Sequence, residues 1–212
     1  MKKKVVIVWN DFYHPKEVIE PALKKLFTED YWDIVKTESA RELLETDLKA
    51  DLAVFYTNGR TEGETDLTYE EQSVIVNKVK NGMGILFYHA GLVMIEKDSP
   101  FYKELNSGRF IHHPEQCEVT VSPIKNASHP ITKDIIPFTQ KDEHYFCQVD
   151  VTHTNLLACA TSGHMTAASV WCHDFGSGRV AGISQGHTLE MQNDEHMLIL
   201  TANTIKWLVK EL

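Results

Sequence analysis

The sequence predicts an α/β fold built on an open, mostly parallel, doubly wound sheet with an antiparallel strand extension. Over residues 1–90, short β-branched apolar runs alternate with segments whose apolar residues recur at helical spacing, as in a parallel sheet covered by helices. In the second half, strand-like segments follow one another with turn signals between them, which favours antiparallel pairing. A chain of 212 residues with 42% hydrophobic residues can bury one core, so we expect a single domain over residues 1–212.

The alternating half contains the parallel strands and the helices that connect them. Strands are predicted at residues 5–9, 32–37, 52–56 and 84–88. Helices are predicted at residues 15–26, 40–45 and 68–80, the last one ending at the typical C-cap pair Asn81-Gly82. Polar loops follow the first and third strands, at residues 10–15 and 57–65.

The second half adds the strands of the extension and a closing helix. Strands are predicted at residues 118–122, 143–149, 155–161, 167–174 and 179–184. A final amphipathic helix at about residues 195–209 follows. Its spacing directs five apolar side chains inward: Leu198, Ile199, Ala202, Ile205 and Leu208.

Charge and hydropathy restrict the partners. A formal net charge of -9 disfavours nucleic acids and anionic membranes, which bind positive surfaces. The apolar run at residues 5–9 is too short for a signal peptide, and no stretch reaches the roughly 18 apolar residues of a membrane span, so we expect a cytoplasmic protein. No glycine-rich phosphate loop indicates a nucleotide cofactor. A small-molecule partner is therefore expected, and self-association into a homo-oligomer is left open.

The four cysteines show no pattern of a functional site. Cys117, Cys147, Cys159 and Cys172 have no CxxC spacing, and their neighbours alternate as in strands. We interpret them as reduced, half-buried strand residues.

Polar side chains follow several of the predicted strands. In an open parallel sheet, ligands bind beyond the carboxyl ends of the strands. Those ends carry the following residues: Asn10, Asp11 and His14 after the first strand, Asn58 and Arg60 after the third, His89 after the fourth, and His187 after the strand at residues 179–184. We expect the binding crevice at this edge of the sheet.

His89 is the sharpest of these candidates. Residues 86–91 read as a strand that runs into a tight turn and a helix, as at a nucleophile elbow, where one side chain projects into the crevice. An imidazole in that position could act as a base or bind a metal ion. The alternative is a histidine that only hydrogen-bonds the turn.

The segment Asp142-Glu143-His144-Tyr145 places four ionisable groups together. If it is a strand, Glu143 and Tyr145 share one face, and Asp142 and His144 share the other. One pair would line a pocket while the other is solvated; the alternative is a polar strand on the surface. Elsewhere, we favour a site role for His187, and we interpret His129, which precedes a proline, as structural.

Several segments together resemble the trehalose-utilisation (ThuA-like) family, whose flavodoxin-like fold resembles that of class I glutamine amidotransferases. The matching blocks occur in family order: GILFYHA at 84–90, GRFIHHP at 108–114, HPIT at 129–132, DEHY at 142–145, and Gly178 to Val180 with Gly186-His187. The loop after the first strand departs from the family's Gly-x-His pattern and reads Trp9-Asn10-Asp11-Phe12-Tyr13-His14. Amidotransferases carry their nucleophilic cysteine where this chain has His89, so thiol acyl transfer at that turn is excluded.

The resemblance implies a role in the use of trehalose or a related disaccharide, with 3-keto-glycosides as one proposed context. Our leading hypothesis is an enzyme, a lyase or hydrolase acting on a sugar derivative, with His89, Glu143 and His187 in proton transfer. A divalent metal (zinc, manganese or iron) would be held by His14, His89, Glu143 and His187. The expected substrate-binding residues are Asn10, His14, Asn58, Arg60, His113 and Tyr145. The rivals are a non-catalytic sugar-binding or regulatory domain and a hydrolase with another nucleophile.

Overall fold

The computed structural model describes residues 2–61, 64–105, 108–125 and 128–212. In these residues, a nine-stranded sheet runs in the order β2-β1-β3-β6-β13-β12-β11-β8-β9. Its parallel part consists of β2 (Trp32–Thr37), β1 (Lys3–Trp9), β3 (Leu52–Tyr56), β6 (Gly84–Tyr88) and β13 (Gly178–Ile183). The antiparallel part consists of β12 (Thr166–Phe175), β11 (Asn155–Thr161), β8 (Cys117–Pro123) and β9 (Phe138–Asp142). This arrangement confirms the predicted α/β fold with its antiparallel extension.

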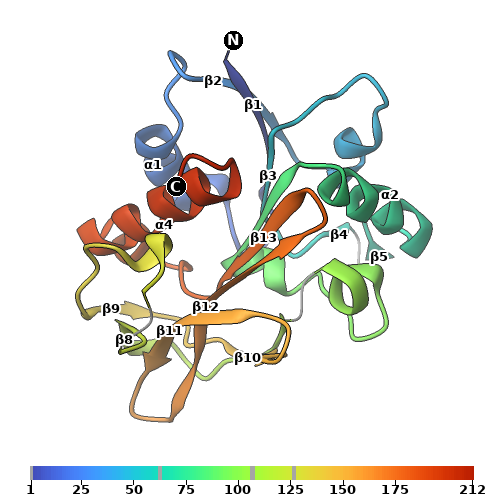
Figure 1. The fold of residues 1–212 in the computed structure, drawn as a ribbon. Coiled ribbons are helices and arrows are strands. Elements are labelled where there is room, and N and C mark those ends of the chain that lie inside the picture. The colour runs from blue at the N-terminus through green and yellow to red at the C-terminus, as the bar shows by residue number, and fades with distance from the viewer. Residues whose placement is uncertain (1, 62–63, 106–107, 126–127) are drawn as a thin grey trace.

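Helices cover both faces of the parallel part. On one face lie α1 (Lys16–Leu26) and α4 (Glu195–Leu208), and on the other lies α2 (Tyr69–Lys80) (Figure 1). The side chains of β1 show why both faces are needed. Val5 and Ile7 pack in the cluster that includes α1 and α4, while Val6 and Val8 pack in the cluster that includes α2. A strand that is buried on both faces reads as the continuous apolar run seen in the sequence.

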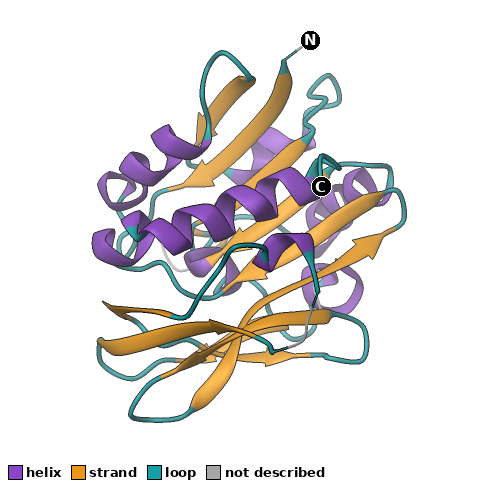
Figure 2. Cartoon of the chain, turned by 60° about the vertical axis from the view of Figure 1, so that its left-hand side comes forward, coloured by secondary structure: helices purple, strands orange, loops and turns teal. Residues whose placement is uncertain are grey.

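Short elements complete the chain. In the described part of the chain, the 3-10 helices are η1 (Ala40–Leu44), η2 (His89–Leu92) and η4 (Pro130–Thr132), and η3 (Phe101–Leu105) is a π-helical turn. The helix α3 (Leu189–Asn193) precedes α4. Two small sheets pair β10 (Phe146–Val149) with β7 (Gly108–His112) and β4 (Arg60–Thr61) with β5 (Glu64–Thr65). Figure 2 shows the antiparallel strands gathered at one end of the parallel layer. No helix among the described residues is long and apolar enough to cross a membrane.

The helix boundaries follow the local signals in the sequence. The N-cap Thr68 of α2 accepts a hydrogen bond from the backbone N–H of Glu71 (3.2 Å), and the Glu71 carboxylate accepts one from the backbone N–H of Thr68 (2.8 Å). This reciprocal pair is a capping box. The helix ends at Lys80, and Asn81 is its C-cap, as predicted.

Two predictions about elements are wrong. Residues 143–145 are not in a strand, because β9 ends at Asp142 and β10 begins only at Phe146. In α4, Leu198, Ile199 and Ala202 are only half-buried, while Thr201 and Thr204 lie in the core. Both threonine hydroxyls donate to carbonyls one turn earlier, to Met197 and Leu200 at 2.8 Å, which removes the cost of burying them. The strands β4, β5, β7 and β9 and the helix α3 were not predicted, and β4 and β5 lie in the segment predicted as a polar loop.

The close approach of β13 to α2 predicts a stability difference between two glycine variants. A Cβ atom on Gly178 would lie 2.0 Å from the carbonyl oxygen of Val79, which is backbone and cannot swing away. We expect Gly178→Ala to lower the free energy of unfolding by about 2 kcal/mol or more. Gly163 has no atom within 4 Å of the same position, so Gly163→Ala serves as the control. Denaturant titration checks both, and equal stability of the two variants would contradict the packing described here.

Candidate metal centre

A cluster of imidazoles and one carboxylate lies where the parallel strands end. His14 follows β1, His89 follows β6 and His187 follows β13, while Glu143 comes from the residue after β9. One ligand atom from each of these four residues lies within 4.8 Å of the others. Segments that are far apart in the sequence thus meet at the edge where the sequence predicted a crevice.

His89 is held in an unusual backbone conformation. Its φ is 42°, in the left-handed region that residues other than glycine rarely adopt. The carbonyl of Ser184 lies 2.8 Å from Nδ1 and can only accept, so Nδ1 carries the proton. Nε2 is therefore unprotonated, buried and without a hydrogen-bond partner among the described residues. A strained backbone of this kind is typical of functional sites. A buried nitrogen without a hydrogen-bond partner needs an explanation, and coordination of a metal ion would be one.

Asp11 orients His14. Its carboxylate accepts hydrogen bonds from Nδ1 of His14 (2.9 Å) and from the backbone N–H groups of Tyr13 (2.9 Å), His14 (3.0 Å) and Asn58 (2.7 Å). Burial alone would raise the pKa of Asp11, but these donors lower it to about 2. The carboxylate therefore stays ionised and fixes the proton of His14 on Nδ1, which leaves Nε2 free. A carboxylate behind a histidine is the usual second layer of a metal site.

Glu143 lies among three imidazoles. Its Oε2 is 3.2 Å from Nδ1 of His187, 3.6 Å from Nε2 of His89 and 3.6 Å from Nε2 of His113. Burial works to raise the pKa of Glu143, but the neighbouring imidazoles outweigh it and hold that pKa below its usual range. The carboxyl group is thus ionised at neutral pH.

Burial keeps two of the imidazoles neutral. It lowers the pKa of His89 to about 4, although the contacts with Glu143 and Ser184 oppose the change. Burial also lowers the pKa of His187, again against the influence of Glu143. Neutral imidazole is the form that binds metals and accepts protons.

The loop that carries His187 is fixed by a second buried carboxylate. Asp142 accepts hydrogen bonds from the backbone N–H groups of Gly186 (2.8 Å), His187 (2.9 Å) and Thr188 (3.0 Å). Gly186 has a φ of 135°, and a Cβ atom there would lie 2.8 Å from the ring of Tyr88. Asp142 and His144 are both fully buried, so the alternative of a polar strand on the surface is wrong, and neither of these two side chains is solvated.

Tyr145 lies between two histidine rings. Its ring stacks on His89 with centroids 4.0 Å apart and on His113 with centroids 5.5 Å apart. Its hydroxyl is 3.4 Å from Nε2 of His14. The Nδ1–H of His113 donates to the carbonyl of Pro114 at 2.8 Å, and its Nε2 lies 3.6 Å from Oε2 of Glu143.

A cavity of about 260 Å³ opens beside the cluster. Its lining includes five of the expected substrate-binding residues: His14, Asn58, Arg60, His113 and Tyr145. It also includes Tyr13 and Phe110, which the sequence did not single out. Asn10 lines a neighbouring cavity with Arg60, and its side-chain oxygen accepts the backbone N–H of Lys16 at 3.1 Å, which ties the loop to the start of α1.

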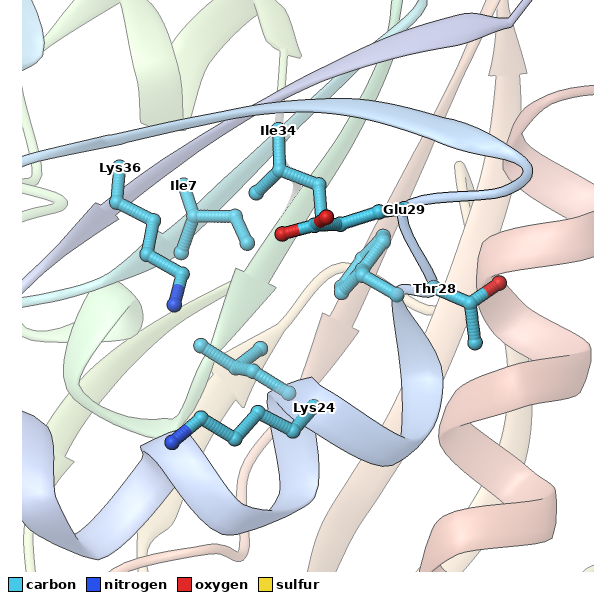
Figure 3. A pocket seen from close by; sticks show the side chains of 8 residues that line it. Ile7, Lys24, Thr28, Glu29, Ile34 and Lys36 are labelled. Carbon is cyan, nitrogen blue, oxygen red and sulfur yellow. The ribbon is translucent and has the colours of Figure 1, made fainter.

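Another cavity, of about 330 Å³, lies between α1 and β2 at the edge of the sheet (Figure 3). Ile7 and Ile34 form part of its apolar wall, and the amines of Lys24 and Lys36 lie beside it. Both amines pair with Glu20, at 3.4 and 3.6 Å. Its lining contains neither an imidazole nor a thiol, so it offers none of the chemistry found at the strand ends.

The donor set fits a divalent transition metal. Three imidazoles and a carboxylate suit zinc, manganese or iron, and Nδ1 of both His14 and His89 is already engaged behind the site. This cluster could therefore hold a metal ion. The sequence signals that found His89 and His187 were the strand ends, whereas no local signal marks Asp11 or Asp142 as the carboxylates that orient the site.

The cysteines and His129 lie away from this chemistry. Cys117, Cys147, Cys159 and Cys172 lie in β8, β10, β11 and β12 and form no disulfide. Burial raises the pKa of Cys172 to about 12, which leaves an unreactive thiol. His129 accepts the backbone N–H of Ile131 at 3.2 Å and caps η4, in agreement with its structural interpretation.

Fold and site together define an α/β protein of the amidotransferase-like architecture that carries a histidine at the turn after β6. The sequence pattern of the family described as ThuA, trehalose utilisation, matches residues 4–208. The chain belongs to this family, which confirms the resemblance noted in the sequence.

Solved structures show the same fold. A ThuA-like protein from Bacteroides uniformis is 19% identical, with a TM-score of 0.76, over 97% of this chain and 91% of that one. A ThuA-like protein from Parabacteroides merdae is 17% identical, with a TM-score of 0.70, over 99% and 90%. A β-galactosidase from Bacillus circulans is 10% identical, with a TM-score of 0.63, over 97% of this chain but only 31% of that one. No curated protein sequence matches the chain.

The low pKa of His89 makes the stability of the metal-free protein depend on pH. An unfolded chain protonates this histidine near pH 6.5, whereas in the fold it stays neutral down to about pH 4. The unfolded state therefore binds more protons in this window, and the free energy of unfolding falls as the pH drops from 6.5 to 4. For His89 the full loss is about 3 kcal/mol.

The variant His89→Asn isolates this contribution, because asparagine tolerates left-handed backbone and does not titrate. Denaturant titration in a chelating buffer should show that the wild type loses more stability than the variant between pH 6.5 and pH 4. Equal losses in the two proteins would contradict the burial of a neutral His89.

Proposed function

We propose that the protein is a metal-assisted enzyme that acts on a sugar derivative as a lyase or hydrolase, with zinc, manganese or iron held by His14, His89, Glu143 and His187. One observation carries the proposal: four ligand atoms converge within 4.8 Å, and one of them, Nε2 of His89, is buried without a hydrogen bond. A buried polar atom left without a partner costs about 1–3 kcal/mol. A ligand at this point would offset that cost.

The substrate class follows from the family and from the lining of the cavity. The family is described by trehalose utilisation, and the cavity is lined by the amide of Asn58, the guanidinium of Arg60 and the imidazole of His113. These groups donate and accept hydrogen bonds, as a hydroxyl-rich ligand requires. We therefore favour trehalose or a related disaccharide, including its 3-keto form, as the small-molecule partner.

The residues of this chain can move a proton next to a sugar ketone. A bound divalent cation would polarise the ketone oxygen. Glu143, which is ionised at neutral pH, accepts the proton from the carbon between the ketone and the glycosidic carbon. The glycosidic C–O bond breaks with its electron pair on oxygen, and Glu143 returns the proton to that oxygen. His187, whose Nδ1 lies 3.2 Å from Glu143, would relay this proton where it is not itself bound to the metal. The products are an unsaturated ketone and an alcohol, and hydrolysis would follow by addition of water.

Elemental analysis tests the metal part of the proposal. Protein purified without a histidine tag should contain about one zinc, manganese or iron ion per chain. His89→Asn should bind far less, because it removes a nitrogen ligand while the left-handed backbone at this position is kept. The exposed His164 provides the control, and His164→Ala should keep the wild-type metal content. A wild-type stoichiometry well below one per chain would remove the metal from the mechanism.

Turnover of 3-keto-disaccharides tests the catalytic part. We expect His89→Ala and His187→Ala each to lower the turnover number by at least about 100-fold, the usual effect of losing a proton-transfer or ligand group. The exposed-site variant His164→Ala should retain the wild-type rate. Unchanged turnover in both site variants would rule out the assigned roles.

The rival function is a sugar-binding or regulatory domain without activity. It gains some support from the Bacillus circulans β-galactosidase, in which the similar fold makes up only 31% of the chain. Thermal shift followed by product analysis separates the two functions. Stabilisation by mono- or disaccharides, or by their oxidised forms, without any product would favour the binding domain.

A further inference from the structure

Two neighbouring aromatic side chains stand exposed beside the candidate centre. Phe12 and Tyr13 are 90% and 65% exposed, which makes them the most exposed of the large apolar side chains among the described residues. Their rings meet edge to face, with centroids 5.0 Å apart and planes at 89°. Exposing apolar surface to water is unfavourable in free energy, so an exposed aromatic pair of this kind indicates a ligand-binding surface.

These aromatic side chains cannot fold back into the protein without damage to the site. The backbone N–H of Asp11 donates to the carbonyl of His14 at 3.2 Å, and the Asp11 carboxylate accepts the backbone N–H groups of Tyr13 and His14. This closed turn holds Phe12 and Tyr13 at its tip. The same carboxylate orients the His14 ring, so the aromatic pair has a fixed position relative to the candidate metal ligands.

The volume of the cavity limits how much of a ligand fits inside it, and therefore which part of the ligand would reach the aromatic pair. Tyr13 lines the cavity together with His14, Glu143 and Tyr145. The cavity measures about 260 Å³, below the roughly 300–1,000 Å³ of pockets that enclose drug-sized ligands. It therefore suits a single sugar ring beside the metal ligands. A second ring attached to the first must lie outside the cavity, next to Tyr13 in its lining and to Phe12, which contacts Tyr13 and lines the neighbouring cavity that shares Arg60.

We propose that Phe12 and Tyr13 form a stacking platform for the second ring of a disaccharide or glycoside whose first ring occupies the cavity. The inference rests on the proposed function and assigns its substrate class to two-ring sugars rather than free monosaccharides. Because the two aromatic rings are perpendicular, the C–H face of a pyranose packs on the face of one of them, and the tyrosine hydroxyl can bond sugar oxygens. Asn58 and Arg60 lie on the same cavity wall and can bind the hydroxyls at the ring edge.

Calorimetric titration of the metal-loaded protein with glucose, trehalose and the 3-keto form of each tests the platform. Phe12 is the better position to change, because its side chain is 90% exposed and its removal should therefore cost the fold little. We expect Phe12→Ala to weaken binding of the two-ring probes by about tenfold and to leave the one-ring probes unchanged. Phe12→Trp should restore the preference. The control is Ile136→Ala, which removes an apolar side chain that is 61% exposed just before β9, and it should bind all probes like the wild type.

The other outcomes overturn the platform in distinguishable ways. Equal effects of Phe12→Ala on one-ring and two-ring probes, or no effect on either, would show that the aromatic pair does not select the second ring. Wild-type protein that contains about one metal ion but binds none of the four probes would overturn the platform while the metal centre stands. If sedimentation shows a dimer that Phe12→Ala dissociates without changing sugar affinity, the aromatic pair is an interface between two copies of the chain.

Discussion

Parallel pairing of β1, β3, β6 and β13 is the constraint on which the rest of this structure depends. Parallel strands end at the same edge of a sheet, so the residues that follow them meet there without any local sequence relationship. His14, Asn58, His89 and His187 come together for this reason. The antiparallel part contributes through β9, whose end delivers Asp142 and Glu143 to the same edge.

Two buried carboxylates fix the positions of the loops that meet at this edge of the sheet. Asp11 accepts hydrogen bonds from the loop after β1 and from the backbone N–H of Asn58. Asp142 accepts hydrogen bonds from three backbone N–H groups of the loop after β13. Each carboxylate satisfies backbone groups that a tight loop would otherwise leave unpaired. Fixing the loops in this way lowers the cost of ordering side chains at the moment of binding, which is the general advantage of a preorganised site.

The sequence predicts the parallel half well because its strands are buried on both faces and read as continuous apolar runs. It misses β9 because burial alternates along this edge strand while two of its three inward residues, Gln140 and Asp142, are polar. The histidines and Glu143 were found because they follow strand-like segments or stand in a dense ionisable cluster. Asp11 was noted only as a polar residue at a strand end. Its role, like that of Asp142, depends on contacts with distant backbone N–H groups, such as the N–H of Asn58 for Asp11, and no periodicity reveals such contacts.

The separation of the candidate ligands along the chain has a consequence for biosynthesis. His14 follows β1 and His187 follows β13, with most of the strands of the large sheet between them in the sequence. During synthesis, the imidazole of His14 therefore meets its partners only after the chain has been made as far as β13, and contacts between such distant residues form slowly. Because β13 pairs with β6 in the middle of the sheet, the cluster closes only when the central strand has been inserted. The four candidate ligands therefore come together only late in folding. In a truncated or partly synthesised chain, the histidines would be separate groups on the surface.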